Sequence, residues 1–160
     1  MPGSPMTRGR STRLEDPLIA LRVVNGHAKR LSEEVDAARR SGQSRRVAAL
    51  LRERASLYTL KTRAVRVLLD AGRLVPVRVD DRGLVVEGDS PLGRLGFHVP
   101  LAEFEEEARG VARGKVWVTG TLGPARATAA RYRLADAIMV LTRLITQARL
   151  RNRPRRTSGP

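Results

Sequence analysis

The sequence contains no cysteine, which excludes disulfide bonds, thiolate catalysis and every metal site built on thiolates. Histidine is also scarce: His27 and His98 are the only two, and neither has a second ligand at the spacing of a metal site. We therefore predict no metal and no cofactor.

The usual arrangements of catalytic groups are missing as well. The acids at positions 103 and 105–107 would fan around a helix axis, whereas paired catalytic carboxylates converge. The glycines at 93 and 96 are not followed by the lysine and hydroxyl of a phosphate-binding loop. These absences predict that the protein is not an enzyme.

Aromatic residues make up only 3% of the chain, which argues against a sheet that stacks several bases. One possible stacking residue is Trp117, on the polar side of a predicted strand at 115–119. Arg78, Arg94 and His98 could share that face if the strands pair. Alternatively, Trp117 packs beneath the last helix or covers the sheet edge.

No long apolar run is present, and the longest strongly apolar stretch is 137–141. The basic segment 1–14 is not followed by the apolar core of a signal peptide. We therefore expect neither a membrane partner nor secretion, and a location in the cytoplasm or nucleoid.

Negative charge is in short supply: 31 Lys and Arg face 16 Asp and Glu, which gives a net charge of +15. Segment 73–120 has seven basic and eight acidic residues, so it is nearly neutral. The excess lies in 1–14 (three basic, no acidic), 15–72 (twelve and seven) and 121–160 (nine and one). A polyanion should therefore meet the helices and the termini first.

Two long helices are predicted over 16–72, joined by a short break that makes them antiparallel neighbours. Asp16 followed by proline is typical of a helix start, and Gly42 of a helix end. Ser44 can cap the second helix and Gly72 can end it. The first helix has an apolar stripe at Leu21, Val24, Ala28, Leu31, Val35 and Ala38.

The apolar period changes to two after the second helix, which predicts strands. Residues 74–79 and 84–87 flank a turn at 80–83 and predict a β-hairpin. Further strands are expected at 94–99 and at 115–119.

A short acidic helix is expected at 100–107 and a long last helix at 124–148. Together these elements predict one α+β domain over 16–148: a long antiparallel helical hairpin, a small antiparallel β-sheet and a long C-terminal helix. Residues 1–15 are expected to form a disordered basic arm, and 149–160 a disordered arginine-rich tail.

Four arginines of the second helix, with Thr59, fall within about 60° of one line on the side opposite its apolar stripe. They are Arg45, Arg52, Arg63 and Arg66. No acid interrupts the line, so it is either a row of phosphate contacts or an ordinary solvated face.

The last segment holds five further arginines with no acid among them: Arg149, Arg151, Arg153, Arg155 and Arg156. Such a run suits DNA, RNA, an acidic protein or an anionic surface equally. We interpret it as a polyanion-binding tail.

Arg54 and Lys61 stand near the middle of the apolar stripe of the second helix, where a charge needs an exit or a partner. One explanation is that they snorkel from under the third helix. The other is a buried ion pair with Glu33, Glu34 or Asp36.

The segment 47–87 has an apolar helix, the run LYTLKTRAVRVLLDAGRLVPV and a hairpin through DDRG. In this it resembles a winged-helix DNA-binding domain, whose recognition helix enters the major groove and whose hairpin is a wing. The resemblance implies that five residues lie near bases or phosphates: Thr59, Lys61, Thr62, Arg63 and Arg66. The segment departs from that family because no glycine or turn dipeptide separates two helices between Val47 and Asp70.

Together these patterns predict a non-enzymatic nucleic-acid-binding protein that acts mainly through phosphate contacts, with DNA and RNA both open. A winged-helix-like transcriptional regulator is the alternative within that class. The competing class is an assembly protein, whose helical stripes form a homo-oligomer and whose tails bind acidic protein partners.

Overall fold

The computed structural model describes residues 13–112 and 131–152. It has the predicted α+β fold, with a helical hairpin, a three-stranded antiparallel sheet and a C-terminal helix. In chain order the elements are α2 (Pro17–Arg40), α3 (Ser44–Asp70), β1 (Val75–Asp80), β2 (Gly83–Ser90), β3 (Gly93–Val99), the 3-10 turn η1 (Leu101–Glu103), α4 (Glu105–Ala112) and α6 (Leu134–Asn152).

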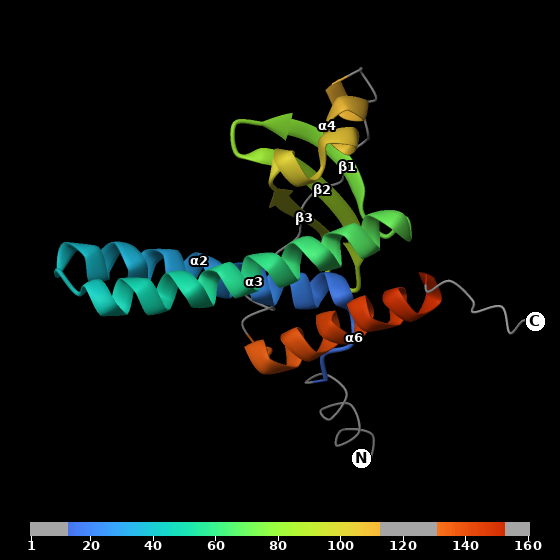
Figure 1. Cartoon of the computed structure of the whole chain (residues 1–160). Coiled ribbons are helices and arrows are strands. Elements are labelled where there is room, and N and C mark those ends of the chain that lie inside the picture. Colours follow the sequence, from blue (N-terminus) through green and yellow to red (C-terminus); the bar gives the residue numbers. More distant parts are fainter. Residues whose placement is uncertain (1–12, 113–130, 153–160) are drawn as a thin grey trace, which may run out of the picture.

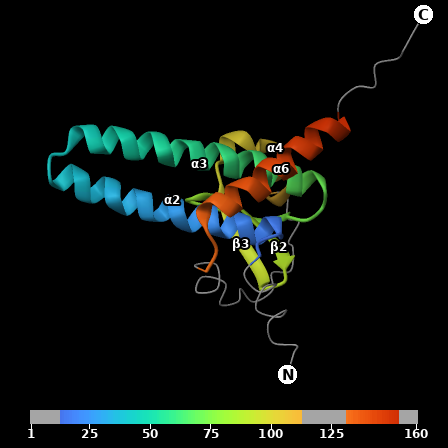
Figure 2. The same cartoon turned by 90° about the horizontal axis from the view of Figure 1, so that it is seen from below.

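The elements form three layers, with the α2–α3 hairpin in the middle. The sheet and α4 lie on one side of the hairpin, and α6 lies on the other (Figure 1). Seen from below, α6 crosses the half of the hairpin that lies under the sheet (Figure 2), and it contacts both α2 and α3. The end of the hairpin that carries the turn extends beyond both layers as an arm.

The start of α2 is fixed by the predicted cap. Asp16 Oδ1 accepts hydrogen bonds from the backbone N–H groups of Leu18 (2.9 Å) and Ile19 (3.2 Å). Asp16 Oδ2 also accepts one from Arg73, just after α3, at 3.3 Å. This carboxylate therefore joins the beginning of one hairpin helix to the end of the other.

Both hairpin helices end at the predicted glycines, which adopt left-handed backbone angles: φ is +68° at Gly42 and +74° at Gly72. The start of α3 differs from the prediction. Ser44 is the first helical residue and not the cap, and the N-cap position belongs to Gln43, whose side chain makes no capping bond. The second helix is therefore held by its packing against α2 and not by a capping side chain.

The predicted β-hairpin and third strand are confirmed, in the order β1-β2-β3. The register shifts between Pro76 and Arg78, so Val77 forms a bulge. One face of the sheet packs on α2, since a Cβ at Gly88 would meet Leu18, and Arg22 lies 5.8 Å from the Phe97 ring centroid.

The short acidic helix is not one element as predicted. It divides into η1 and α4 at Phe104, whose side chain is buried. The guanidinium of Arg66 lies 4.6 Å from the centroid of the Phe104 ring. The break in the helix thus coincides with the burial of this ring beside α3, which the acidic pattern alone did not show.

The C-terminal helix also has different bounds. Residues 131–133 are not helical, α6 begins at Leu134, and the predicted helical residues 124–130 lie outside the described part of the chain. Because Ala148 is still buried against the fold, α6 continues to Asn152, and the residues at 149–152 belong to a helix and not to a disordered tail.

The predicted N-terminal arm and the predicted fourth strand lie largely or wholly outside the described residues. Leu14, which we placed in the disordered arm, is buried in the core, while 1–12 lie outside the described residues. The strand expected at 115–119 also lies outside them.

Gly88 provides a test of how the sheet docks on the hairpin. A Cβ there would collide with the carbonyl oxygen of Arg73 and lie 2.8 Å from a Leu18 methyl carbon. Gly88→Ala should lower the free energy of unfolding by about 1–3 kcal/mol in urea denaturation. Gly26→Ala, in α2 with open space around it, should instead raise it by about 0.5–1 kcal/mol. Equal effects would contradict this packing.

Candidate functional site

A cleft of about 930 Å³ lies where the sheet meets the hairpin. Five segments of the chain line it. From α2 come Arg22, Asn25, Lys29 and Ser32, and from α3 come Tyr58, Thr59, Lys61, Thr62 and Arg63. The remaining wall consists of Arg82 in the β1–β2 turn, Glu103 in η1 and residues 96–100 from β3 onward.

The cleft is strongly basic. Five of its described lining residues are cations, and one is a carboxylate, Glu103. The cations are Arg22, Lys29, Lys61, Arg63 and Arg82. They come from both hairpin helices and from the sheet, so the three segments together concentrate positive charge in one concave place.

Lys61 lies deepest among these cations, with only 8% of its surface exposed. Its Nζ donates a 2.7 Å hydrogen bond to Oδ1 of Asn25. The pKa of Lys61 is lowered to about 8, mainly by burial and also by the positive charges of Arg82 and Arg22. The ammonium is thus hydrogen-bonded to a neutral amide and faces other cations.

The environment of Lys61 matches neither sequence expectation. It does not snorkel to the surface, and it pairs with Asn25 and not with an acid of α2. Arg54 is half-buried: its Nη1 donates to Ser32 Oγ at 3.0 Å, and its guanidinium lies 5.8 Å from the Tyr58 ring centroid. Both cations of the stripe therefore use neutral partners across the hairpin.

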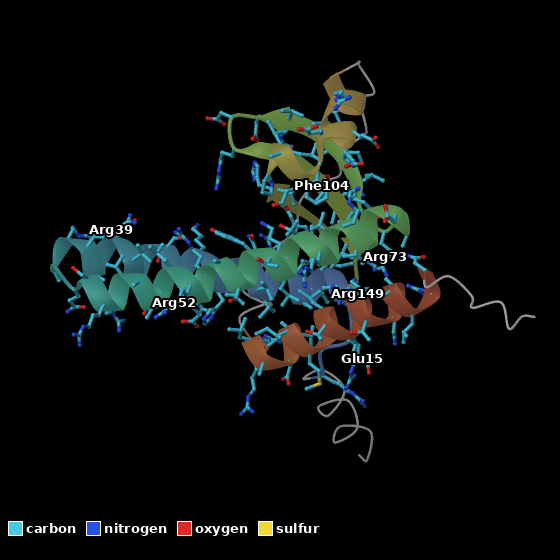
Figure 3. All side chains as sticks on the ribbon, viewed as in Figure 1. Glu15, Arg39, Arg52, Arg73, Phe104 and Arg149 are labelled. Carbon is cyan, nitrogen blue, oxygen red and sulfur yellow. The ribbon has the colours of Figure 1, made fainter. Side chains whose placement is uncertain are left out.

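The predicted arginine row of α3 leads toward this cleft. Arg45 and Arg52 are exposed on the arm (Arg52 is labelled in Figure 3). Within the described residues, the guanidinium groups of Arg45, Arg52 and Arg63 make no hydrogen bond or ion pair. Arg63 and Thr59 line the cleft as well, so the row and the cleft form one continuous surface.

Arg66, the fourth member of the row, has a different environment. It donates hydrogen bonds to Glu107 Oε1 (3.0 Å) and to the carbonyl oxygen of Glu103 (3.1 Å), and it lies over the Phe104 ring. These contacts hold α4 against α3. The predicted phosphate contact at Arg66 would have to compete with them.

Of the other predicted site residues, two lie in α6 and four lie outside the described part of the chain. Arg149 and Arg151 are exposed near the end of α6 (Arg149 is labelled in Figure 3), across the hairpin from the sheet. Four further candidates lie outside the described residues: Trp117, Arg153, Arg155 and Arg156.

Arg78, Arg94 and His98 share one face of the sheet, as the alternation predicted. Each is paired with an acid there. Arg94 Nε lies 2.9 Å from the buried carboxylate of Glu87, Arg78 lies 3.9 Å from it, and His98 Nε2 lies 2.9 Å from Asp80. The hydrogen bond from His98 is the main cause that lowers the pKa of Asp80. This face is therefore nearly neutralised.

Sequence reasoning missed several cleft residues, namely Arg22, Lys29, Arg82 and Tyr58. A signal for part of the set was present, because positions 22, 25, 29 and 32 form one line beside the apolar stripe of α2. The contribution of Arg82 had no such signal, since it depends on where the β1–β2 turn lies above the hairpin.

The resemblance to a winged helix does not extend to the structure. Residues 44–70 form one uninterrupted helix, so no separate recognition helix exists in the segment that carried the resemblance. Lys61 and Thr62, which the resemblance placed near bases, line the cleft beside the sheet.

The fold and site together define an α+β protein with a basic cleft between a helical hairpin and a small sheet. Comparisons with protein-family models, curated proteins and solved structures find no match to this chain. Within the described residues, no helix has the length and apolar character needed to cross a membrane. The same residues hold no group of three or more side chains suited to a metal ion.

The pKa of Lys61 predicts a pH dependence of stability. Between pH 8 and 10.5 the unfolded chain holds a proton on Lys61 that the folded chain has released. The stability of the wild type relative to Lys61→Met should therefore rise by about 3 kcal/mol across this range, measured by urea unfolding. A constant difference for Lys61→Met would contradict the buried ammonium.

The contact between α4 and α3 predicts that stability also rises with pH in the acid range. The hydrogen bond from Arg66 lowers the pKa of Glu107 below its ordinary 4.5, so its stabilisation is present above that value and is lost as pH falls through the folded pKa. Glu107→Gln should cost about 1 kcal/mol at neutral pH and nothing at pH well below 4.5. Glu105→Gln, at an exposed acid of the same helix, is the control and should have a small effect at both.

Proposed function

We propose that this protein is a non-enzymatic nucleic-acid-binding protein that holds its ligand mainly through phosphates. The observation that carries the proposal is the basic cleft together with the arginine row that continues from it. Phosphates are the anions that such a surface would meet as a regular series, because nucleic-acid backbones repeat them along the strand.

The environment of Lys61 supports an anion as the ligand. Its neighbours in the cleft oppose its charge, and its one described hydrogen-bond acceptor is a neutral amide. A phosphate that entered the cleft would supply the missing negative charge and could accept hydrogen bonds from several of the cations at once.

The length of the surface favours an extended polyanion over a small one. Eighteen residues of α3 separate Arg45 from Arg63, which corresponds to about 27 Å of helix. Arg52 and Thr59 lie between them on the same side. A nucleic-acid strand could therefore contact both the arm and the cleft.

The surface offers more contacts to phosphates than to base edges. Arginine and lysine near a backbone fix position and contribute affinity without reading sequence. We therefore propose binding with little sequence preference, which separates this function from a site-specific regulator. The proposed location in the cytoplasm or nucleoid agrees with such a ligand.

The alternative of assembly through the helical stripes has weaker support. The stripe of α2 is buried against α3 and α6 within one molecule, so it does not remain available to a second copy. An assembly protein could still bind acidic proteins through its cationic surface. The experiment below therefore also tests an acidic polypeptide.

The test is the salt dependence of binding to a labelled oligonucleotide, followed by fluorescence anisotropy. With five phosphate contacts, the slope of log K against log salt should be about −4.5 for a duplex and about −3.5 for a single strand. The triple variant Lys29→Gln/Arg63→Gln/Arg82→Gln should flatten the slope by about one unit for each phosphate that no longer meets a cation.

The control removes the same number of charges from elsewhere. Arg13, Arg46 and Arg109 each already pair with a glutamate, so replacing these three by glutamine should leave the slope nearly unchanged. No binding at low salt, or binding by an acidic polypeptide as tight as by the oligonucleotide, would overturn the proposal.

A further inference from the structure

The cleft differs from a surface made for a duplex, because its deepest cation is hard to reach. Lys61 is 8% exposed, whereas Tyr58 and the β1–β2 turn residue Arg82, which line the same cleft, are exposed. A duplex presents its phosphates on a convex, stiff cylinder, which cannot bring them to the bottom of a concave site. A ligand that reaches Lys61 must be narrow.

The size of the cleft also indicates a narrow ligand. A volume of about 930 Å³ is within the range of sites that enclose small molecules, about 300–1,000 Å³. From Arg22 to Ser32 the cleft follows ten residues of α2, or about 15 Å of helix. These dimensions suit a few nucleotides of one strand.

One aromatic side chain belongs to the exposed part of the cleft lining. Tyr58 is 43% exposed and lines the cleft. The Arg54 guanidinium lies against its ring and is itself held by Ser32, so the ring has a fixed partner within the protein. Tyr58 and Lys61 are i, i+3 neighbours on α3, with Cβ atoms about 5–6 Å apart.

We infer that the cleft binds an unpaired nucleic-acid strand, with one base stacked on Tyr58 and an adjacent phosphate bound by Lys61. This inference rests on the proposed function and names the form of nucleic acid that the cleft accepts. Bases of an intact duplex are stacked on each other and present only their edges, so they cannot stack on Tyr58. Arg63 and the row beyond it would carry the strand out along α3.

The experiment compares a labelled single strand of about 12 nucleotides, within the range of common single-strand sites, with a blunt duplex of the same sequence. Tyr58→Leu keeps an apolar side chain and removes the ring, and should weaken single-strand binding about 10-fold without changing duplex binding. Tyr58→Phe keeps the ring and should bind as the wild type does. Thermal melting checks that both variants fold, which we expect because the side chain is exposed.

Each outcome separates the inference from the function on which it rests. Equal binding of single strand and duplex, with neither changed by Tyr58→Leu, would overturn the inference and leave the phosphate-binding function intact. Binding of neither would overturn both. Competition by a nucleoside monophosphate as effective as that by the single strand would show a nucleotide site and would also overturn the strand-binding inference.

Discussion

The structure depends on the burial of the first turns of α2. From Leu18 to Val24 the helix is apolar at every position except Arg22, and this stretch is buried around nearly its whole circumference. A helix that is apolar on all sides cannot lie on a surface and needs a neighbour on each side. The sheet covers it from one side, and α3 with α6 covers it from the others. The three layers follow from this requirement, because a two-layer packing would leave part of the stretch in water.

The same requirement explains where the molecule has its cleft and its arm. Beyond Leu31 the apolar residues of α2 narrow to a single stripe, which α3 alone can cover. The sheet and α6 have no apolar surface to bury there, so the hairpin continues without them (Figure 1). The cleft lies at the step where the sheet stops and the uncovered hairpin begins. Cations gather at this step because it is the first place along α2 where long polar side chains can reach solvent beside the core.

The sequence allowed most of the fold to be predicted, because its signals are local. The apolar period, the capping Asp16 and the glycines located the hairpin helices and three strands, although β2 runs three residues beyond its predicted end at 87. The site was harder to predict because its residues are distant in the chain and depend on tertiary packing. Charge sums over segments hid Arg82, since the β segment is neutral as a whole, whereas Glu103 is the only one of its acids that lines the cleft. Arg66 looked like a member of the solvated row, but the packing of Phe104 occupies it, and no pattern in α3 itself indicates that contact.

Lys61 occupies a position where a charged side chain costs stability. A methionine could fill the same space beside Leu57 and Ala64 without the cost of desolvating an ammonium, so the core gives no reason for a lysine there. Asn25 satisfies one of its three donors, which limits the cost but does not remove it. A bound phosphate would offset that cost, and a ligand that binds only the folded chain also shifts the folding equilibrium toward it. If the cleft binds a phosphate as proposed, its occupation and the stability of the hairpin around it would be linked through this one side chain.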